Sequence, residues 1–396
     1  MRVTSEPIRP PPSIRAILAA AVTAMLLVRP ACAAEGTDPQ NASPKATEVS
    51  ATDGAQRWAF VPILISNAET GVQVGALVMR FLNPGDTADN PSTVELAARV
   101  SQKSQMQVDV VPEWYLDHNR LHIVGDLDYI RWPADFYGIG NGSDIPIDSA
   151  DAYLAQGFSG DLTAEREILP KLFLGPRARF NYEDISSKSP HALLIDTVPG
   201  KDGGLVSGLG GVLTYDDRDA IYWARRGGIL RAKGLWYRSW WGSDFDYDAY
   251  CLEARRFFPV SATGALGFAA TFELHDGDVP FRELSTANGD QLMRGLVRGK
   301  YRDLDMLILQ AEYKSYLPDW DWLSHPWVRN RIGWAVFAEA GQVAHSPGDI
   351  SWEGYRAGYG IGLRYAMNPA QRLNIRADLG FVDNGIAPAI DIKEAF

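Results

Sequence analysis

Long runs of alternating apolar and polar residues fill most of this 396-residue chain. Within residues 307–314, for example, leucine, alanine and tyrosine alternate with glutamine, glutamate and lysine. Successive side chains of a β-strand point to opposite faces, so such a run predicts a strand with one apolar and one charged face. A soluble sandwich also alternates, but its polar face meets bulk water and its sheets have edges to protect. Long strands with charges of both signs on one face instead favour an apolar outer wall around a wet lumen.

The alternation predicts an all-β protein, a 16-stranded antiparallel transmembrane β-barrel with both chain ends on the periplasmic side. The 12 Trp and 16 Tyr suit the aromatic belts of such a barrel. Short periplasmic turns then alternate with long outer loops at 133–150, 185–203, 276–303 and 342–352. The predicted strands are 57–66, 71–82, 93–103, 106–116, 119–132, 151–166, 171–184, 204–217, 227–239, 245–258, 264–275, 304–316, 329–341, 353–366, 371–382 and 388–396.

The N-terminus is expected to be a secretory signal peptide, residues 1–34. Arginines precede an apolar run of about 13 residues, Ala16–Val28, which is too short to span a bilayer as a helix, and small residues follow it. A lipoprotein cut before Cys32 is the alternative. Residues 35–56 are interpreted as a disordered periplasmic linker and residues 57–396 as the barrel.

The charge and the cysteine count exclude several classes of protein. The net charge is −11, and it becomes −14 without the signal peptide, because that segment carries four Arg and one Glu. This acidity argues against binding to nucleic acid. Cys251 would be the only cysteine left, so no internal disulfide is possible. The six His show no metal-ligand spacing, so we expect no metal. We also expect no cofactor and no catalysed reaction. A barrel lipase is a remaining alternative, although no Ser–His pair stands out.

The segment Gln291–Asp303 is polar, glycine-rich and too long for a hairpin turn. It predicts a large loop between two strands, with basic residues at Arg294, Arg298, Lys300 and Arg302. In one interpretation it is a solvated basic loop. In the other it folds inward and meets carboxylates on the lumen wall.

Several stretches together resemble the bacterial surface antigen family, the barrel of the BamA/TamA-like outer-membrane assembly and secretion proteins. They follow the family's order over about residues 57–396. The loop Gln291–Asp303 resembles the Arg-Gly-aromatic signature of the family's sixth outer loop. The other matching stretches are Pro62–Gly75, Phe136–Asn141, Leu213–Gly228, Phe337–Gly341, Tyr359–Tyr365 and Leu373–Gly380.

Three departures from the family pattern stand out. Leu296 occupies a position where an aromatic residue is usual, and Glu339 one where Asp is usual. Residues 35–56 are also too few to form one of the family's periplasmic POTRA domains.

The resemblance implies that Arg294 reaches into the lumen and pairs with Glu339, which locks the sixth loop inside the barrel. Glu339 falls on the inward face of its strand, so the pairing is possible, and Gly295 would let the loop turn tightly. In the alternative, Arg294 stays solvated and Glu339 pairs with Arg364 or Arg356 on the lumen wall.

Three further sets of residues are candidates. Arg376 and Asp378 are expected to pair on the lumen wall. The run Asp216, Arg218 and Asp219 predicts a turn stapled by the arginine, with a calcium site as the alternative. An alternating final strand that stops on Phe396 is similar to the assembly signal of outer-membrane barrels.

The resemblance implies an integral protein of the Gram-negative outer membrane that inserts or moves proteins or lipids. Its weak seam would lie between the first and last strands. Expected partners are outer-membrane lipids, the machinery that inserts this barrel, unfolded barrel substrates and a separate periplasmic subunit. The main alternative is a passive pore or structural barrel without an assembly role.

Overall fold

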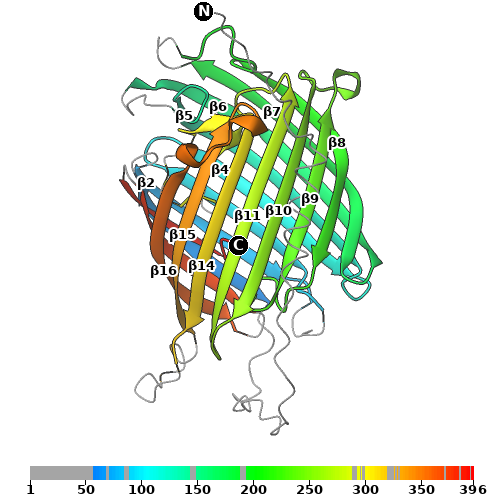
Figure 1. Cartoon of the computed structure of the whole chain (residues 1–396), viewed down its shortest axis with the longest axis vertical. Coiled ribbons are helices and arrows are strands. Elements are labelled where there is room, and N and C mark those ends of the chain that lie inside the picture. Colours follow the sequence, from blue (N-terminus) through cyan, green and yellow to red (C-terminus); the bar gives the residue numbers. More distant parts are fainter. Residues whose placement is uncertain are drawn as a thin grey trace, which may run out of the picture. The chain divides into compact units, whose positions relative to one another are not determined.

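The computed structural model contains sixteen long strands in one antiparallel sheet (Figure 1). It describes residues 57–67, 71–83, 89–142, 149–187, 193–287, 292–294, 296, 299–318, 325, 328, 331–369, 372–382, 385–392 and 394–396. The predicted signal peptide and linker lie outside the described residues. Among those described, no helix is both long and apolar enough to cross a membrane.

Each long strand pairs with the long strand that follows it in the chain, which is the order the alternation predicted. Two short strands, β12 (Ser285–Thr286) and β13 (Arg302–Asp303), pair with each other between β11 and β14. The sixteen long strands are β1 (Trp58–Asn67), β2 (Gly71–Phe81), β3 (Thr93–Ser101), β4 (Met106–Leu116), β5 (Leu121–Phe136), β6 (Asp151–Leu169), β7 (Leu172–Ser187), β8 (Gly203–Asp216), β9 (Gly227–Tyr237), β10 (Tyr247–Pro259), β11 (Gly264–Gly277), β14 (Asp305–Tyr316), β15 (Ile332–Ala344), β16 (Arg356–Asn368), β17 (Leu373–Val382) and β18 (Gly385–Ile392).

The two faces of the sheet differ as the alternation predicted. On β14, Leu309 is 40% exposed on the outer face, whereas Gln310, Glu312 and Lys314 on the inner face are at most 5% exposed. Large apolar side chains also stand exposed on other strands, at Phe60, Phe158, Tyr359 and Leu363 among others. An apolar outer face around a charged interior is the pattern of a barrel in lipid.

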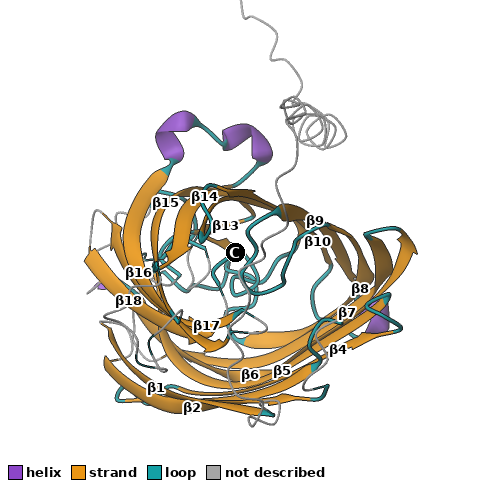
Figure 2. Cartoon of the chain, turned by 90° about the horizontal axis from the view of Figure 1, so that it is seen from below, coloured by secondary structure: helices purple, strands orange, loops and turns teal. Residues whose placement is uncertain are grey.

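The sheet curls until its two end strands, β1 and β18, contact each other (Figure 2). Every other neighbouring pair of long strands is joined by a hydrogen-bonded ladder. Between β1 and β18 the described residues form no such ladder. We call this contact between β1 and β18 the junction.

We call the end of the barrel with the β5–β6, β7–β8, β11–β14 and β15–β16 connections the loop end, and the opposite end the turn end. The prediction of short turns throughout the turn end was wrong, because the β2–β3, β8–β9 and β14–β15 connections there span residues 82–92, 217–226 and 317–331. At the loop end the described parts of the β11–β14 connection, residues 278–287, 292–294, 296 and 299–304, fold into the lumen, and Figure 2 shows loop segments inside the curved sheet. Some strands run further than predicted: β5 continues to Phe136 and β15 to Ala344.

The last strand differs most from its prediction of 388–396. It begins at Gly385 and ends at Ile392. Phe396 is 5% exposed and packs inside the barrel against the ring of Phe257 on β10, with the ring centroids 6.4 Å apart. Alternation alone placed these residues in the strand, because it carries no information about where a chain leaves the sheet.

Candidate functional site

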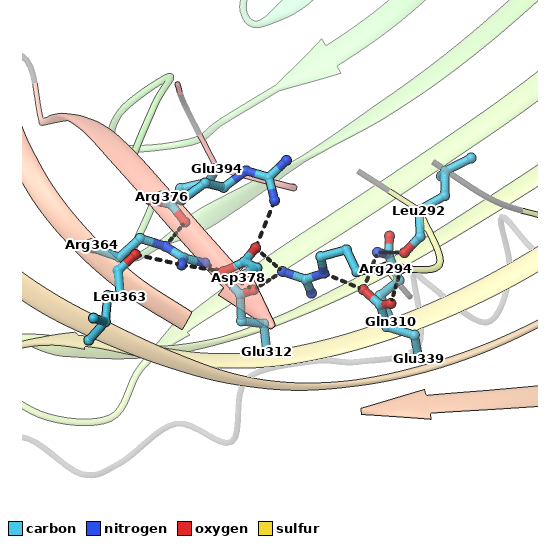
Figure 3. A network of polar contacts seen from close by, with 10 residues as sticks. All are labelled: Leu292, Arg294, Gln310, Glu312, Glu339, Leu363, Arg364, Arg376, Asp378 and Glu394. Atoms are coloured by element: carbon cyan, nitrogen blue, oxygen red, sulfur yellow. Dashed lines mark hydrogen bonds and ion pairs between the residues drawn. The ribbon is translucent and has the colours of Figure 1, made fainter. Parts of the chain in front are cut away.

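Arg294 of the β11–β14 connection lies buried in the lumen and binds the carboxylate of Glu339 on β15 (Figure 3). Its Nε donates to Oε1 of Glu339 at 2.7 Å, and its backbone N–H donates to Oε2 at 2.7 Å. The guanidinium stacks on the ring of Phe337, with Cζ 3.4 Å from the ring centroid. The structure therefore brings together the two residues that the family signature pairs.

Two further carboxylates share the Arg294 guanidinium. Nη1 donates to Glu312 on β14 at 2.9 Å and to Asp378 on β17 at 3.0 Å. Gln310 donates to Glu339 at 3.0 Å and to the carbonyl of Leu292 at 2.7 Å, which ties the loop backbone to β14. Burying ions is costly, and hydrogen-bonded partners of opposite charge offset that cost. We call Arg294, Gln310, Glu312, Glu339 and Asp378 the Arg294 cluster.

The Arg294 cluster continues along the wall to the C-terminal tail. Arg364 on β16 donates to Asp378 at 2.5 Å and to Glu394 at 2.7 Å. Asn374 on β17 also donates to Glu394, at 3.0 Å. Glu394 lies just beyond the last strand, so this chain of contacts connects the loop to the segment that carries Phe396 (Figure 3).

The other lumen-wall arginines have separate partners. Arg376 donates to Asp378 at 2.7 Å, which is the expected wall pair. Arg356 instead donates to the carbonyl of Asn141 at 3.1 Å and lies 5.0 Å from the ring centroid of Tyr301, so it contacts loop-end residues. The alternative partner for Glu339, Arg364, is bound elsewhere. Gly295 lies outside the described residues.

A second attachment holds the same connection to β7, and the sequence reasoning missed it. Arg282 donates to both carboxylate oxygens of Glu183, at 3.0 and 2.8 Å. Glu283 pairs with Arg179 and accepts from Asn181 at 2.8 Å. These five residues form the Arg282 cluster. The alternation already placed Arg179, Asn181 and Glu183 on one inward face, but nothing in the spacing indicated which loop would reach them.

The electrostatics of Glu283 follow from this pairing. Burial by itself would raise the pKa of its carboxyl group, but the charge of Arg179 together with the bonds from Arg179 and Asn181 lowers that pKa below its usual value. Glu283 therefore stays ionised at neutral pH. The loop is held at both clusters by ionic hydrogen bonds.

Loop-end residues of the stretch Phe136–Asn141 pack over the same connection. Phe136 and Phe281 meet edge to face, 5.1 Å apart, and Arg302 lies over both rings. The backbone N–H of Gly140 donates to the carbonyl of Arg302 at 2.7 Å. This stretch thus contacts the connection near both of its ends, at Phe281 and at Arg302.

The predicted turn staple is present between Asp216 and Arg218, with Nη2 to Oδ2 at 2.6 Å. Asp219 does not share that arginine. It accepts instead from Arg372, at 2.8 Å, in the β16–β17 turn. Among the described residues, no group of His, Cys, Asp and Glu gathers as metal ligands.

The lumen keeps some free space beside the Arg282 cluster. A cavity of about 340 Å³ is lined by groups of both signs, including Asp128, Arg179, Glu283 and Arg302. The described site contains paired ions and packing contacts. Its chemistry is therefore that of a brace that fixes a loop across a lumen.

The fold and the braced lumen define the class: a large antiparallel membrane barrel whose own loop is bound inside it. Residues 91–384 match the Omp85 superfamily domain, and the chain belongs to that superfamily. A comparison with curated proteins finds no match.

Two solved structures share the fold. BamA from Haemophilus ducreyi lacking POTRA domains 1–3 is 12% identical, with a TM-score of 0.54; the alignment covers 85% of this chain and 69% of that one. CdiB from Acinetobacter baumannii is 11% identical, with a TM-score of 0.51, and the coverage is 85% and 60%. At these identities the likeness extends to the fold alone.

Proposed function

We propose that this chain is an integral barrel of the Gram-negative outer membrane that inserts or translocates other proteins, or lipids, at that membrane. The observation that carries the proposal is Arg294, buried on three carboxylates inside a barrel of the Omp85 superfamily. Two structural neighbours, BamA and CdiB, share this barrel. The periplasmic side is the turn end and the outer side is the loop end.

The protein acts in this proposal without catalysing a reaction. Its apolar outer face contacts outer-membrane lipids, and the barrel-assembly machinery inserts it. Its substrates are unfolded barrel proteins, delivered by a separate periplasmic subunit. The loop, fixed at two clusters, braces the lumen. The barrel wall opens at the junction between β1 and β18, because the described residues form no hydrogen-bonded ladder there.

Quantitative mass spectrometry of outer membranes tests the assembly role. Membranes from cells with and without the protein are compared, and wild type, Arg294→Ala and Arg120→Ala are returned on plasmids. Arg120 is the control because it lies 57% exposed in the turn between β4 and β5. Selective loss of other barrels or secreted proteins, restored by wild type and Arg120→Ala but not by Arg294→Ala, supports the role. An unchanged proteome rejects it.

A passive pore is the second candidate, and the mixed-charge cavity of about 340 Å³ in the lumen favours it. In that case the purified wild-type barrel conducts ions steadily across a planar bilayer. The outer-membrane proteome is then the same with and without the protein.

A further inference from the structure

The connection between β8 and β9, residues 217–226, lies at the turn end and folds inward. We call it the mouth turn. Connections of a barrel normally face water. Here Tyr222, Trp223 and Ala224 are 5%, 0% and 2% exposed. The mouth turn therefore buries its tip inside the barrel.

Tyr222 reaches the opposite wall. It packs in one apolar cluster with Ala59 of β1, Met79 of β2 and Leu373 of β17. In the order of the sheet, β8 and β9 lie in the middle, whereas β1, β2 and β17 lie at the two ends. The mouth turn thus spans the lumen and contacts the sheet on both sides of the junction.

The next two residues pack against other parts of the barrel. The ring of Trp223 lies 4.6 Å from that of Tyr316 at the end of β14, and 5.1 Å from Nζ of Lys314. Ala224 packs with Phe257 and with Phe396 of the C-terminal tail. Contacts therefore extend from one short turn to β1, β2, β10, β14 and β17.

The mouth turn is held by packing and by polar contacts with the two neighbouring turns at the same end: Nη2 of Arg225, for example, donates to the carbonyl of Ser261 in the β10–β11 turn, at 2.7 Å. The indole Nε1 of Trp223 has no hydrogen-bond partner among the described residues. Near its start, an ion pair between Asp219 and Arg372 fastens it to the β16–β17 turn, and these side chains are 40% (Arg372) and 29% (Asp219) exposed. Arg372 also donates to the carbonyl of Trp223, at 3.4 Å. The contacts of Arg225 and Asp219 with the neighbouring turns are exposed to solvent, where ion pairs and hydrogen bonds contribute little, and apolar contacts carry no direction.

We propose that the mouth turn is a releasable plug. It closes the turn end of the lumen and bridges the two ends of the sheet across the junction, and passage through the lumen requires that it swing out. Gly227, with φ +82°, lies at its base, where a Cβ would meet the carbonyl oxygen of Asp217 at 2.0 Å. The plug is a property of the barrel itself and does not rest on the assembly role.

Single-channel recording of the refolded mature barrel in planar lipid bilayers tests the plug. The disrupting variant is Tyr222→Ala combined with Trp223→Ala. Trp240→Ala is the matched control, because Trp240 is 77% exposed in the loop-end connection between β9 and β10. We expect a wild type that is closed most of the time, a several-fold higher open fraction in the double variant, and wild-type behaviour in the control.

A charge-reversal set tests the fastening and covers the case in which the double variant does not fold. Asp219→Arg and Arg372→Asp should each raise the open fraction, and the two together should return it toward the wild-type level. Aspartate suits position 372, because φ there is +55° and Asp tolerates that conformation better than most residues. Folding is checked by the heat-dependent shift in gel mobility. Folded variants that all conduct like wild type would overturn the plug.

Discussion

Arg294 and Glu339 are joined by two separate hydrogen bonds, one from the backbone N–H and one from the guanidinium Nε, each 2.7 Å long. One carboxylate therefore fixes both the loop backbone and the side chain. It leaves Nη1 free to reach Glu312 and Asp378. Because the Arg294 and Glu339 side chains are 1% and 0% exposed, water has little access to replace a lost partner.

Shortening Glu339 should cost stability in proportion to the bonds lost. Glu339→Asp reaches one methylene less and can keep one of the two contacts with Arg294. Glu339→Ala removes both and leaves a buried guanidinium with one carboxylate fewer, a loss of about 3 kcal/mol. Urea unfolding of the refolded barrel, followed by tryptophan fluorescence, should rank wild type above Glu339→Asp and Glu339→Ala last. Equal stability of all three would contradict the two-bond arrangement.

The attachment at the Arg282 cluster should depend on pH. The folded-state pKa of Glu283 is lowered by Arg179 and Asn181, despite burial that would raise it. The stability that ionised Glu283 gives to the folded loop is therefore fully present above about pH 4.3, the usual glutamate pKa. That stability is lost as the pH falls through the lowered pKa of Glu283 in the folded protein. Protection of residues 278–287 from hydrogen exchange should drop in acid for wild type.

The control for that pH dependence is Glu283→Gln, which has no carboxyl group to titrate. It should show weaker protection of the same segment at neutral pH and a smaller change in acid. If the protection of residues 278–287 from hydrogen exchange in wild type stays constant as the pH is lowered from neutral to acid, Glu283 does not hold the loop.

Arg364 should hold the C-terminal tail inside the barrel. It bonds Glu394 at 2.7 Å, and Phe396 follows two residues later. In Arg364→Ala the tail loses this anchor, so carboxypeptidase should release Phe396 from the folded barrel faster than from wild type. Arg356→Ala is the matched control, because this second arginine of β16 bonds Asn141 instead. Equal rates of Phe396 release in all three proteins would show that Arg364 does not hold the tail.

Phe396 should matter for assembly in the cell as well as for packing. If the terminal Phe is an assembly signal, Phe396→Ala accumulates unfolded chain in cells while the same protein refolds normally from urea. Phe396→Trp, which keeps a terminal aromatic ring, should assemble close to normally. If Phe396→Ala refolds as poorly in detergent as it assembles in cells, packing against Phe257 accounts for the defect.

Much of the fold could be predicted because the two faces of a strand are visible in its own sequence, as alternate residues. The charged inner face of β14, at Gln310, Glu312 and Lys314, is visible in the sequence as every second residue. The Arg294–Glu339 pair needed the family signature as well, since the two residues are far apart in the chain. No local pattern could pair Arg282 with Glu183, because both the loop path and the partner strand have to be known.

By itself the sequence determined the number and order of the long strands and which of their side chains face the lumen, because alternation and hairpin connections act between neighbours in the chain. Only the tertiary structure decided which loop charges meet β7, that the mouth turn crosses to β1 and β17, and that Phe396 leaves the last strand to pack on Phe257. The reason is physical. Contacts inside a lumen depend on how far a loop or tail reaches across it, and that distance exists only once the sheet has curled.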